Sequence, residues 1–310
     1  GIVLGAAPII YTLYAHHLRF DATHPDYFNR DRFVMSAGHG SALLYATLSL
    51  AGYAIELEDL KQFRQLDSIT PGHPEFGLTP GVEVTTGPLG QGFATAVGMA
   101  IAEKHSEALL NTKKNTVIDY HIYCLCGDGD LMEGVSYEAA SLAGTLALNN
   151  LIVLYDSNHV CLDGETSQVF VDDIEQRFTA MNWEVFTIND DISTIDKTIE
   201  KAKSSSKPVL IQVKTIIGKY SKDAGKNIVH GKPLSDEDIS SIKKQMNIRD
   251  IPFTISGEVL DDFQTLIASR NEHIYEQWNQ MIETLEEPQK SILNDLMNTD
   301  KMISLTNINY

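Results

Sequence analysis

The chain has 310 residues, of which 43% are hydrophobic, and its 42 acidic and 24 basic residues give a formal net charge of −18. This excess of acidic residues excludes nucleic acid and anionic membrane surfaces as general partners. No stretch approaches twenty uninterrupted apolar residues and no signal peptide is present, so we expect a soluble, cytoplasmic protein. The three cysteines, Cys124, Cys126 and Cys161, have neither disulfide-framework nor metal-site spacing, which fits a reducing compartment.

The first part of the chain predicts helices around one short strand, followed by a long loop. In chain order we expect a helix established by Ala7, a strand at 32–36, and helices at 41–52, 56–63 and 92–110. The stretch 68–92 is dense in glycine and proline. A loop of that length in a compact domain is usually functional or disordered.

The next part alternates strands and helices. Strands are expected at 119–126, 151–156, 184–188 and 208–215, and helices at 133–148, 173–182 and 193–205. This alternation predicts an α/β fold with a doubly wound, mostly parallel sheet and helices on both faces. Beyond Gly225 we expect a loop with a capped helix in 227–246, then a charged helical extension over 258–298.

One strand–helix–strand unit carries the strongest functional signal. In GDGDLMEGVSYEAASLAGTLALNNLIVLYDSN, residues 127–158, an acidic residue stands between two glycines and an asparagine follows an apolar run thirty positions later. The unit is typical of a right-handed parallel crossover, whose two strands end at the same edge of the sheet. We therefore expect Asp128 and Asn158 to meet at that edge, where open α/β sheets hold ligands.

The residue types at this edge indicate a metal-bridged diphosphate site. Carboxylate and amide oxygens suit Mg²⁺ or Ca²⁺ rather than zinc. Gly127 and Gly129 permit a close approach of the backbone to an anion, which the following helix N-terminus also favours. An alternative is a glycine turn with Asp130 as helix cap and Glu133 as the far half of a capping box. The stretch matches neither the G-x-G-x-x-G nor the P-loop pattern.

Five stretches together resemble one family, the N-terminal diphosphate-binding domain of transketolase, a thiamine diphosphate enzyme. These stretches are SAGHGS, TPGHPE, TTGPLGQG, GDGDLMEG with DSN, and VHGKPL. The metal motif is common to thiamine diphosphate enzymes, whereas TPGHPE and GPLGQG indicate transketolase or dihydroxyacetone synthase. The resemblance covers residues 1–285. It implies that 286–310 are a helical tail or linker toward a pyrimidine-binding domain that this sequence lacks.

The resemblance also implies a role for each matching residue. Asp128 and Asn158 would bind Mg²⁺ or Ca²⁺ through their side chains, and Val160 would do so through its backbone carbonyl. The residues implied to contact thiamine diphosphate are His39, Gly87, Leu89, Asp128, Gly129, Asn158 and His230. Catalytic roles are implied for His39, His73, His230 and Glu133, with His73 near the donor sugar and Glu133 paired across a dimer. The role of His159 is open.

The activity implied by the resemblance is transfer of a two-carbon ketol unit from a ketose phosphate to an aldose phosphate, in the pentose phosphate pathway. The pyrimidine-binding domain supplies the activating glutamate and the substrate-phosphate ligands in this family. We therefore expect this chain to be a fragment or one subunit of a split enzyme, inactive alone, and part of a homodimer in the full enzyme. The alternatives are a component of dihydroxyacetone synthase, deoxyxylulose phosphate synthase or a dehydrogenase, and a non-catalytic assembly module.

Overall fold

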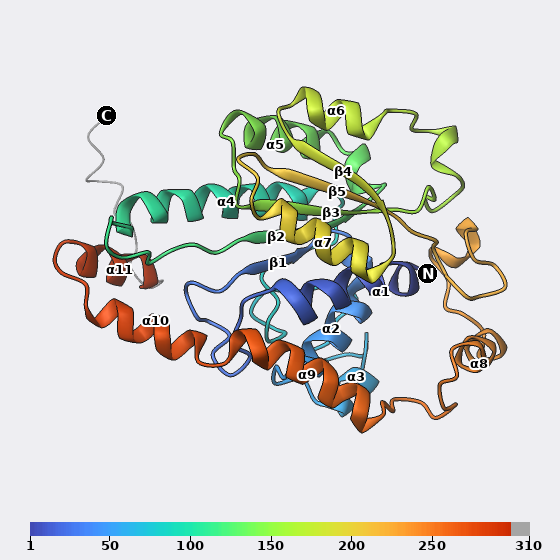
Figure 1. Ribbon diagram of the computed structural model, residues 1–310. Coiled ribbons are helices and arrows are strands. Elements are labelled where there is room, and N and C mark those ends of the chain that lie inside the picture. Colours follow the sequence, from blue (N-terminus) through green and yellow to red (C-terminus); the bar gives the residue numbers. More distant parts are fainter. Residues whose placement is uncertain (299–310) are drawn as a thin grey trace.

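The computed structural model describes residues 1–298, which form a layered α/β structure around a single parallel sheet (Figure 1). The sheet order is β1-β2-β3-β5-β4, and all four strand pairs are parallel. The strands are β1 (Arg32–Met35), β2 (Ile122–Gly127), β3 (Leu151–Ser157), β4 (Glu184–Asn189) and β5 (Val209–Lys214). The predicted fold class is therefore confirmed.

Both faces of the sheet are buried, because alternate residues of each strand enter two separate hydrophobic clusters. On β2, Tyr123 and Leu125 face one cluster, whereas Cys124 and Cys126 face the other. The same alternation on β3 sends Leu154 to the first cluster and Tyr155 to the second. This two-sided burial explains the nearly continuous apolar sequence of the strands.

Helices cover each face as right-handed crossovers require. Three helices between β1 and β4 pack on one face: α4 (Gln91–Leu110), α5 (Gly134–Thr145) and α6 (Ile174–Ala180). The chain then reverses direction across the sheet, so α7 (Ile192–Ala202) packs on the opposite face together with α1 (Ile2–Thr12) and α2 (Ser41–Leu50). In Figure 1, α5 and α6 lie above the strands, and α1 and α2 lie below them.

Element boundaries differ from the predicted ones by a few residues. The strand predicted at 119–126 begins only at Ile122, because residues 119–121 approach the sheet without strand pairing. The helix predicted at 133–148 ends at Thr145. The short helix α3 (Leu57–Lys61) has the capping box formed by Glu56 and Asp59.

The long loop 68–92 is fixed to the body of the domain by polar contacts. Glu83 accepts two hydrogen bonds of 2.8 Å each from the Arg30 guanidinium. Ser41 Oγ donates to the Gly72 carbonyl at 2.8 Å, and Thr86 Oγ1 donates to the Met35 carbonyl at 2.8 Å. The glycine- and proline-rich stretch is therefore an ordered loop, held beside the end of β1.

The C-terminal part consists of helices that return along the domain (Figure 1). They are α8 (Asp236–Gln245), capped by Ser235, followed by α9 (Gly257–Asn271), α10 (Ile274–Glu283) and α11 (Gln289–Met297). The Arg270 guanidinium donates to the carbonyls of Tyr14, Ala15 and Leu18, where the first helix ends in a π turn. The extension predicted over 258–298 is thus helical and docked. Of the tail or linker predicted at 286–310, residues 299–310 lie outside the described residues.

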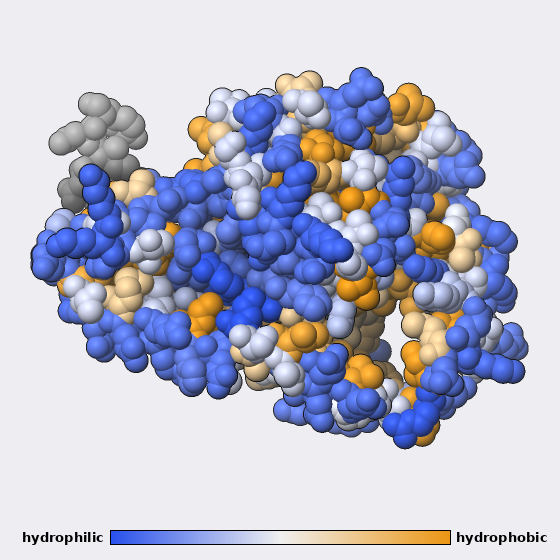
Figure 2. Space-filling view, viewed as in Figure 1, coloured by the Kyte–Doolittle hydropathy of each residue, from blue (hydrophilic) through white to orange (hydrophobic). Residues whose placement is uncertain are grey.

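The surface seen in Figure 2 is mainly hydrophilic, with apolar patches around an opening beside the segment that carries α8. An apolar groove of about 610 Å³ lies between helices α2 and α3 and the segment 243–255. Among residues 1–298, no helix combines the length and the apolarity that crossing a membrane requires.

A buried carboxylate lies near the edge of the sheet where the strands begin. Glu103 of α4 is 1% exposed and accepts a 2.6 Å hydrogen bond from Asn150 Nδ2, whereas the buried Asn150 Oδ1 has no partner among the described residues. Burial raises the pKa of Glu103 to about 7, and the nearby Lys104 ammonium opposes the shift. The native state therefore binds more protons than the unfolded state between about pH 4.5 and pH 7, so this group's contribution to stability is lost as pH rises through that window.

We expect Glu103→Gln to stabilise the protein relative to wild type by about 2 kcal/mol at pH 8 and to have little effect near pH 4.5. Glutamine keeps an acceptor for Asn150 Nδ2 and adds an amide donor for Asn150 Oδ1. Urea unfolding at both pH values measures the difference. Glu138→Gln, on an exposed side chain of α5, is the control. An equal effect of Glu103→Gln at both pH values would contradict the proton linkage.

Candidate functional site

A cavity of about 220 Å³ opens at the edge where strands β1, β2 and β3 end. It brings together most of the residues singled out in the sequence, from five separate segments. Those that line it are His39, Leu89, Asp128, Gly129, Glu133, Asn158, Val160 and His230. The apolar side chains of Ile2, Leu162 and Ile217 complete the wall.

Asp128 lines this cavity and comes directly after β2. Its side chain is 4% exposed. Oδ1 accepts a 2.5 Å hydrogen bond from the Tyr155 hydroxyl, and Oδ2 accepts from the backbone N–H groups of Asn158 at 3.3 Å and His159 at 3.1 Å. Burial raises the pKa of Asp128, although these hydrogen bonds oppose the shift. Among residues 1–298 no Lys or Arg forms an ion pair with this carboxylate.

Asn158 follows β3 and lies beside Asp128 at the same edge. Its amide Nδ2 donates to Asp156 Oδ2 at 3.1 Å, and its Oδ1 accepts from the Val160 N–H at 3.1 Å. Burial raises the pKa of Asp156 to about 6. Because this value is still below 7, the group is mainly an ionised carboxylate at neutral pH and accepts hydrogen bonds. In the described part of the chain, the Val160 carbonyl has no hydrogen-bond donor.

Two histidines singled out in the sequence, His39 and His230, line the cavity and stack on each other. The rings of His39 and His230 lie 5.2 Å apart between centroids, at an interplanar angle of 25°. Desolvation lowers the pKa of His39 to about 4, with further contributions from His230 and His73, although part of His39 is open to solvent. Burial also lowers the pKa of His230. Both imidazoles are therefore neutral at pH 7 and able to donate or accept a proton.

His73 and Gly87 do not line the cavity but lie together next to it. A Cβ added to Gly87 would approach the His73 ring at 3.4 Å, so the ring lies against this glycine. Gly38, beside His39, faces the same loop, and a Cβ there would meet Thr86 Oγ1 at 2.8 Å and the Gly87 nitrogen at 3.0 Å. The glycines of SAGHGS and TTGPLGQG therefore permit two loops to pack backbone against backbone.

The alternative in which Asp130 and Glu133 cap a helix is wrong. Glu133 occupies the N-cap of α5, but its side chain makes no capping hydrogen bond and is exposed at the cavity. The fully buried Asp130 carboxylate accepts instead from Ser36 Oγ at 2.6 Å, Gly90 N at 2.8 Å and Gly127 N at 3.0 Å. Asp130 thus joins three loops of the site, a role that its local sequence does not reveal.

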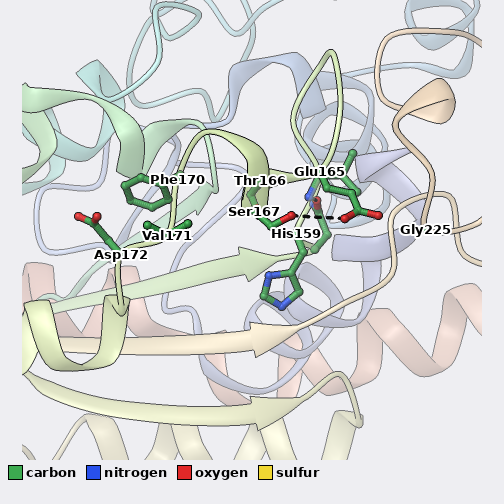
Figure 3. Close-up of a pocket in the computed structure, with 10 residues that line it drawn as sticks. His159, Glu165, Thr166, Ser167, Phe170, Val171, Asp172 and Gly225 are labelled. Atoms are coloured by element: carbon green, nitrogen blue, oxygen red, sulfur yellow. Dashed lines mark hydrogen bonds between the residues drawn. The ribbon is translucent and has the colours of Figure 1, made fainter.

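His159, whose role the sequence leaves open, contacts the site through its backbone. It adopts a left-handed conformation with φ 61°, which directs its N–H toward Asp128. Its imidazole instead lines a second cavity, of about 380 Å³, on the outer side of the turn. Figure 3 shows the ring below the turn, with Thr166, Ser167, Phe170 and Asp172 around this outer cavity.

The donor set fits a hard divalent cation. It offers a buried carboxylate without a cationic partner, an amide oxygen whose orientation is fixed, and a backbone carbonyl that accepts no hydrogen bond among the described residues. Oxygen donors of these kinds are those that Mg²⁺ and Ca²⁺ take in proteins. No cluster of three or more His, Cys, Asp or Glu side chains suited to a metal occurs in residues 1–298, so any cation here would depend on these mixed oxygen donors.

Comparison with known proteins gives a consistent result. The family described as transketolase, thiamine diphosphate binding domain, matches residues 1–300. The transketolase of Bacillus subtilis is 50% identical over 284 residues, covering 90% of this chain and 43% of that protein. The transketolase of Staphylococcus aureus strain MRSA252 is 48% identical over 291 residues, covering 93% and 44% respectively. The chain thus spans less than half the length of these relatives.

Solved structures agree with this match. Transketolase from Leishmania mexicana superposes with a TM-score of 0.91 at 42% identity, over 96% of this chain and 44% of that one. A Pichia stipitis transketolase in complex with sedoheptulose-7-phosphate gives a TM-score of 0.89 at 40% identity, over 95% and 43%. On these matches and this architecture, the chain belongs to the transketolase family and corresponds to its N-terminal, thiamine diphosphate-binding domain.

Proposed function

We propose that the cavity holds the diphosphate of thiamine diphosphate through Mg²⁺ or Ca²⁺. The cation would be bound by the side chains of Asp128 and Asn158 and by the Val160 carbonyl. The observation that carries the proposal is the convergence of these oxygens around a buried carboxylate that lacks a cationic partner. Without a cation, an anionic diphosphate beside this carboxylate would be strongly unfavourable.

The remaining residues of the site take the roles that the family resemblance implies for them. Gly129 would lie against the diphosphate, while Gly87 and Leu89 would contact the aminopyrimidine. The neutral imidazoles of His39 and His230 would hold and move protons beside the diphosphate and reaction centre, and His73 would orient a donor sugar hydroxyl. When bound, thiamine diphosphate supplies the group that stabilises a carbanion during carbon–carbon bond cleavage.

At the level of the whole protein, we propose ketol transfer from ketose phosphates to aldose phosphates in the pentose phosphate pathway, in the cytoplasm. Support comes from the family match and from the relative solved with sedoheptulose-7-phosphate. The activity would require a pyrimidine-binding domain, in the same or a separate chain. The exposed Glu133 carboxylate would face its counterpart across a homodimer.

Calorimetry tests the cofactor site directly. Titration of the chain with thiamine diphosphate is expected to show one site in the presence of Mg²⁺ and none after the metal is removed with EDTA, because the cation bridges two anionic partners. Thiamine, which lacks the diphosphate, is the matched control ligand. Equal heats with thiamine and thiamine diphosphate, or binding that EDTA leaves unchanged, would contradict the proposal.

A further inference from the structure

We propose that Tyr155 and Asp156, consecutive residues at the end of β3, are positioning residues that each orient one side-chain ligand of the cation. The inference rests on the metal role proposed for Asp128 and Asn158. Because successive side chains of a strand point to opposite faces of the sheet, two consecutive residues can contact two different ligands of the cation without contacting each other. Tyr155 lies on the face covered by α5 and α6, and Asp156 lies on the opposite face.

Tyr155 fixes the carboxylate of Asp128. The Tyr155 side chain is 2% exposed, and its hydroxyl donates to Asp128 Oδ1 at 2.5 Å. The other oxygen, Oδ2, already accepts the two backbone N–H groups of the turn that follows β3. With both oxygens held from the protein side, rotation of the carboxyl group about its terminal bond is blocked, and the lone pair that remains on Oδ1 has a fixed direction.

Asp156 fixes which atom of the Asn158 amide is available to a cation. Asp156 is fully buried; Oδ1 accepts from the Thr215 hydroxyl, and Oδ2 accepts from Asn158 Nδ2 at 3.1 Å. A carboxylate only accepts and the Val160 N–H only donates, so the amide must turn its NH₂ to Asp156 and its oxygen to Val160. The amide oxygen, rather than the NH₂ group, is therefore held on the side of the Val160 backbone.

A tyrosine can be buried in this sheet without a hydrogen bond to its hydroxyl. Tyr123 lies on the adjacent strand β2 and is fully buried, yet its hydroxyl has no hydrogen-bond partner among the described residues. The bond between Tyr155 and Asp128 is therefore not a general requirement of tyrosines in this core. Tyr123→Phe provides a control that matches Tyr155→Phe in chemistry, burial and neighbouring strand.

The test measures the apparent dissociation constant for Mg²⁺ at fixed thiamine diphosphate, by calorimetry on the full chain. Tyr155→Phe and Asp156→Asn are each expected to raise it by about tenfold or more, as loss of an outer ligand partner commonly does. Tyr123→Phe is expected to leave it within about twofold of wild type. Thr215→Val, which removes only one donor to Asp156, serves as a milder variant should Asp156→Asn fail to fold.

Thermal unfolding without ligand separates positioning from a merely structural role. A structural role would lower Tm with and without ligand and leave the Mg²⁺ constant of the folded protein unchanged. Unchanged constants in Tyr155→Phe and in the Asp156 or Thr215 variant would overturn the inference while leaving the proposed cofactor site intact. Absence of metal-dependent binding in wild type would overturn both.

Discussion

An Asp128→Asn chain is expected to lose metal-dependent binding of thiamine diphosphate, with the apparent affinity lowered by about a hundredfold or more. The change removes the one charged ligand proposed for the cation, and losing even an outer partner of a ligand costs about ten- to a hundredfold. Asparagine keeps the shape of the side chain and an oxygen for the Tyr155 hydroxyl or the backbone donors. The fold is therefore expected to survive.

Asp163→Asn is the control for this prediction, because Asp163 is an exposed carboxylate only five positions beyond Asn158. Calorimetry with Mg²⁺ and thiamine diphosphate measures affinity, and circular dichroism verifies that both variants are folded. If Asp128→Asn bound as tightly as Asp163→Asn, the cation would have to be held elsewhere. The proposed set of oxygen donors would then be wrong.

The convergence of Asp128 and Asn158 was predictable because it depends on regular structure. Two apolar runs joined by a helix of suitable length form a right-handed crossover, which places both strand ends at one edge. In the structure Gly127, the last residue of β2, pairs with Asp156, so Asp128 leaves the sheet beside Ser157, the last residue of β3, and Asn158 follows directly. The roles proposed for His39, His73 and His230 come from the resemblance rather than from any periodicity.

The hydrogen-bond partners of Asp130 were not predictable from local sequence. A capping box is a short-range pattern, and GDGDLMEG satisfies its spacing. The carboxylate instead binds Ser36 and Gly90, which are 94 and 40 positions away, because a fully buried charge requires several donors that the helix end alone does not provide. Loops without periodicity, such as 68–92, determine these contacts.

The roles inferred for Tyr155 and Asp156 were not predictable from local sequence for a related reason. In LIVLYD these residues end a predicted buried strand, where a tyrosine is common and a single aspartate indicates only that a turn begins. A buried acid at the end of a parallel strand is nevertheless a signal, since such a group must find donors. The docking of the C-terminal helices was likewise not predictable, because it depends on contacts between distant parts of the chain. Arg270 donates to the carbonyls that end the first helix, and the buried Trp278 donates to the Val117 carbonyl.

Gly144→Ala is expected to destabilise the protein by about 3 kcal/mol or more, because it forces a methyl group into a contact with no free space. Gly144 is buried near the end of α5, where an added Cβ would lie only 1.7 Å from the Met181 carbonyl oxygen. That oxygen belongs to the turn between α6 and β4, which is itself bound to α5. Asn182 Nδ2 donates to the Gly144 carbonyl at 3.0 Å, and Trp183 Nε1 donates to the Ala140 carbonyl at 2.8 Å.

The turn cannot move away from the new methyl group without breaking these two hydrogen bonds. The loss of stability therefore comes both from overpacking and from weakened hydrogen bonds. Gly98→Ala in α4 is the matched control, because an added Cβ there meets nothing within 4 Å. Alanine in that exposed helical position is expected to stabilise by about 0.5–1 kcal/mol. Urea unfolding measures both variants. Changes of opposite sign in the free energy of unfolding would establish the close packing of α5 against the turn between α6 and β4. A stabilising Gly144→Ala would instead show that the helix lies farther from this turn.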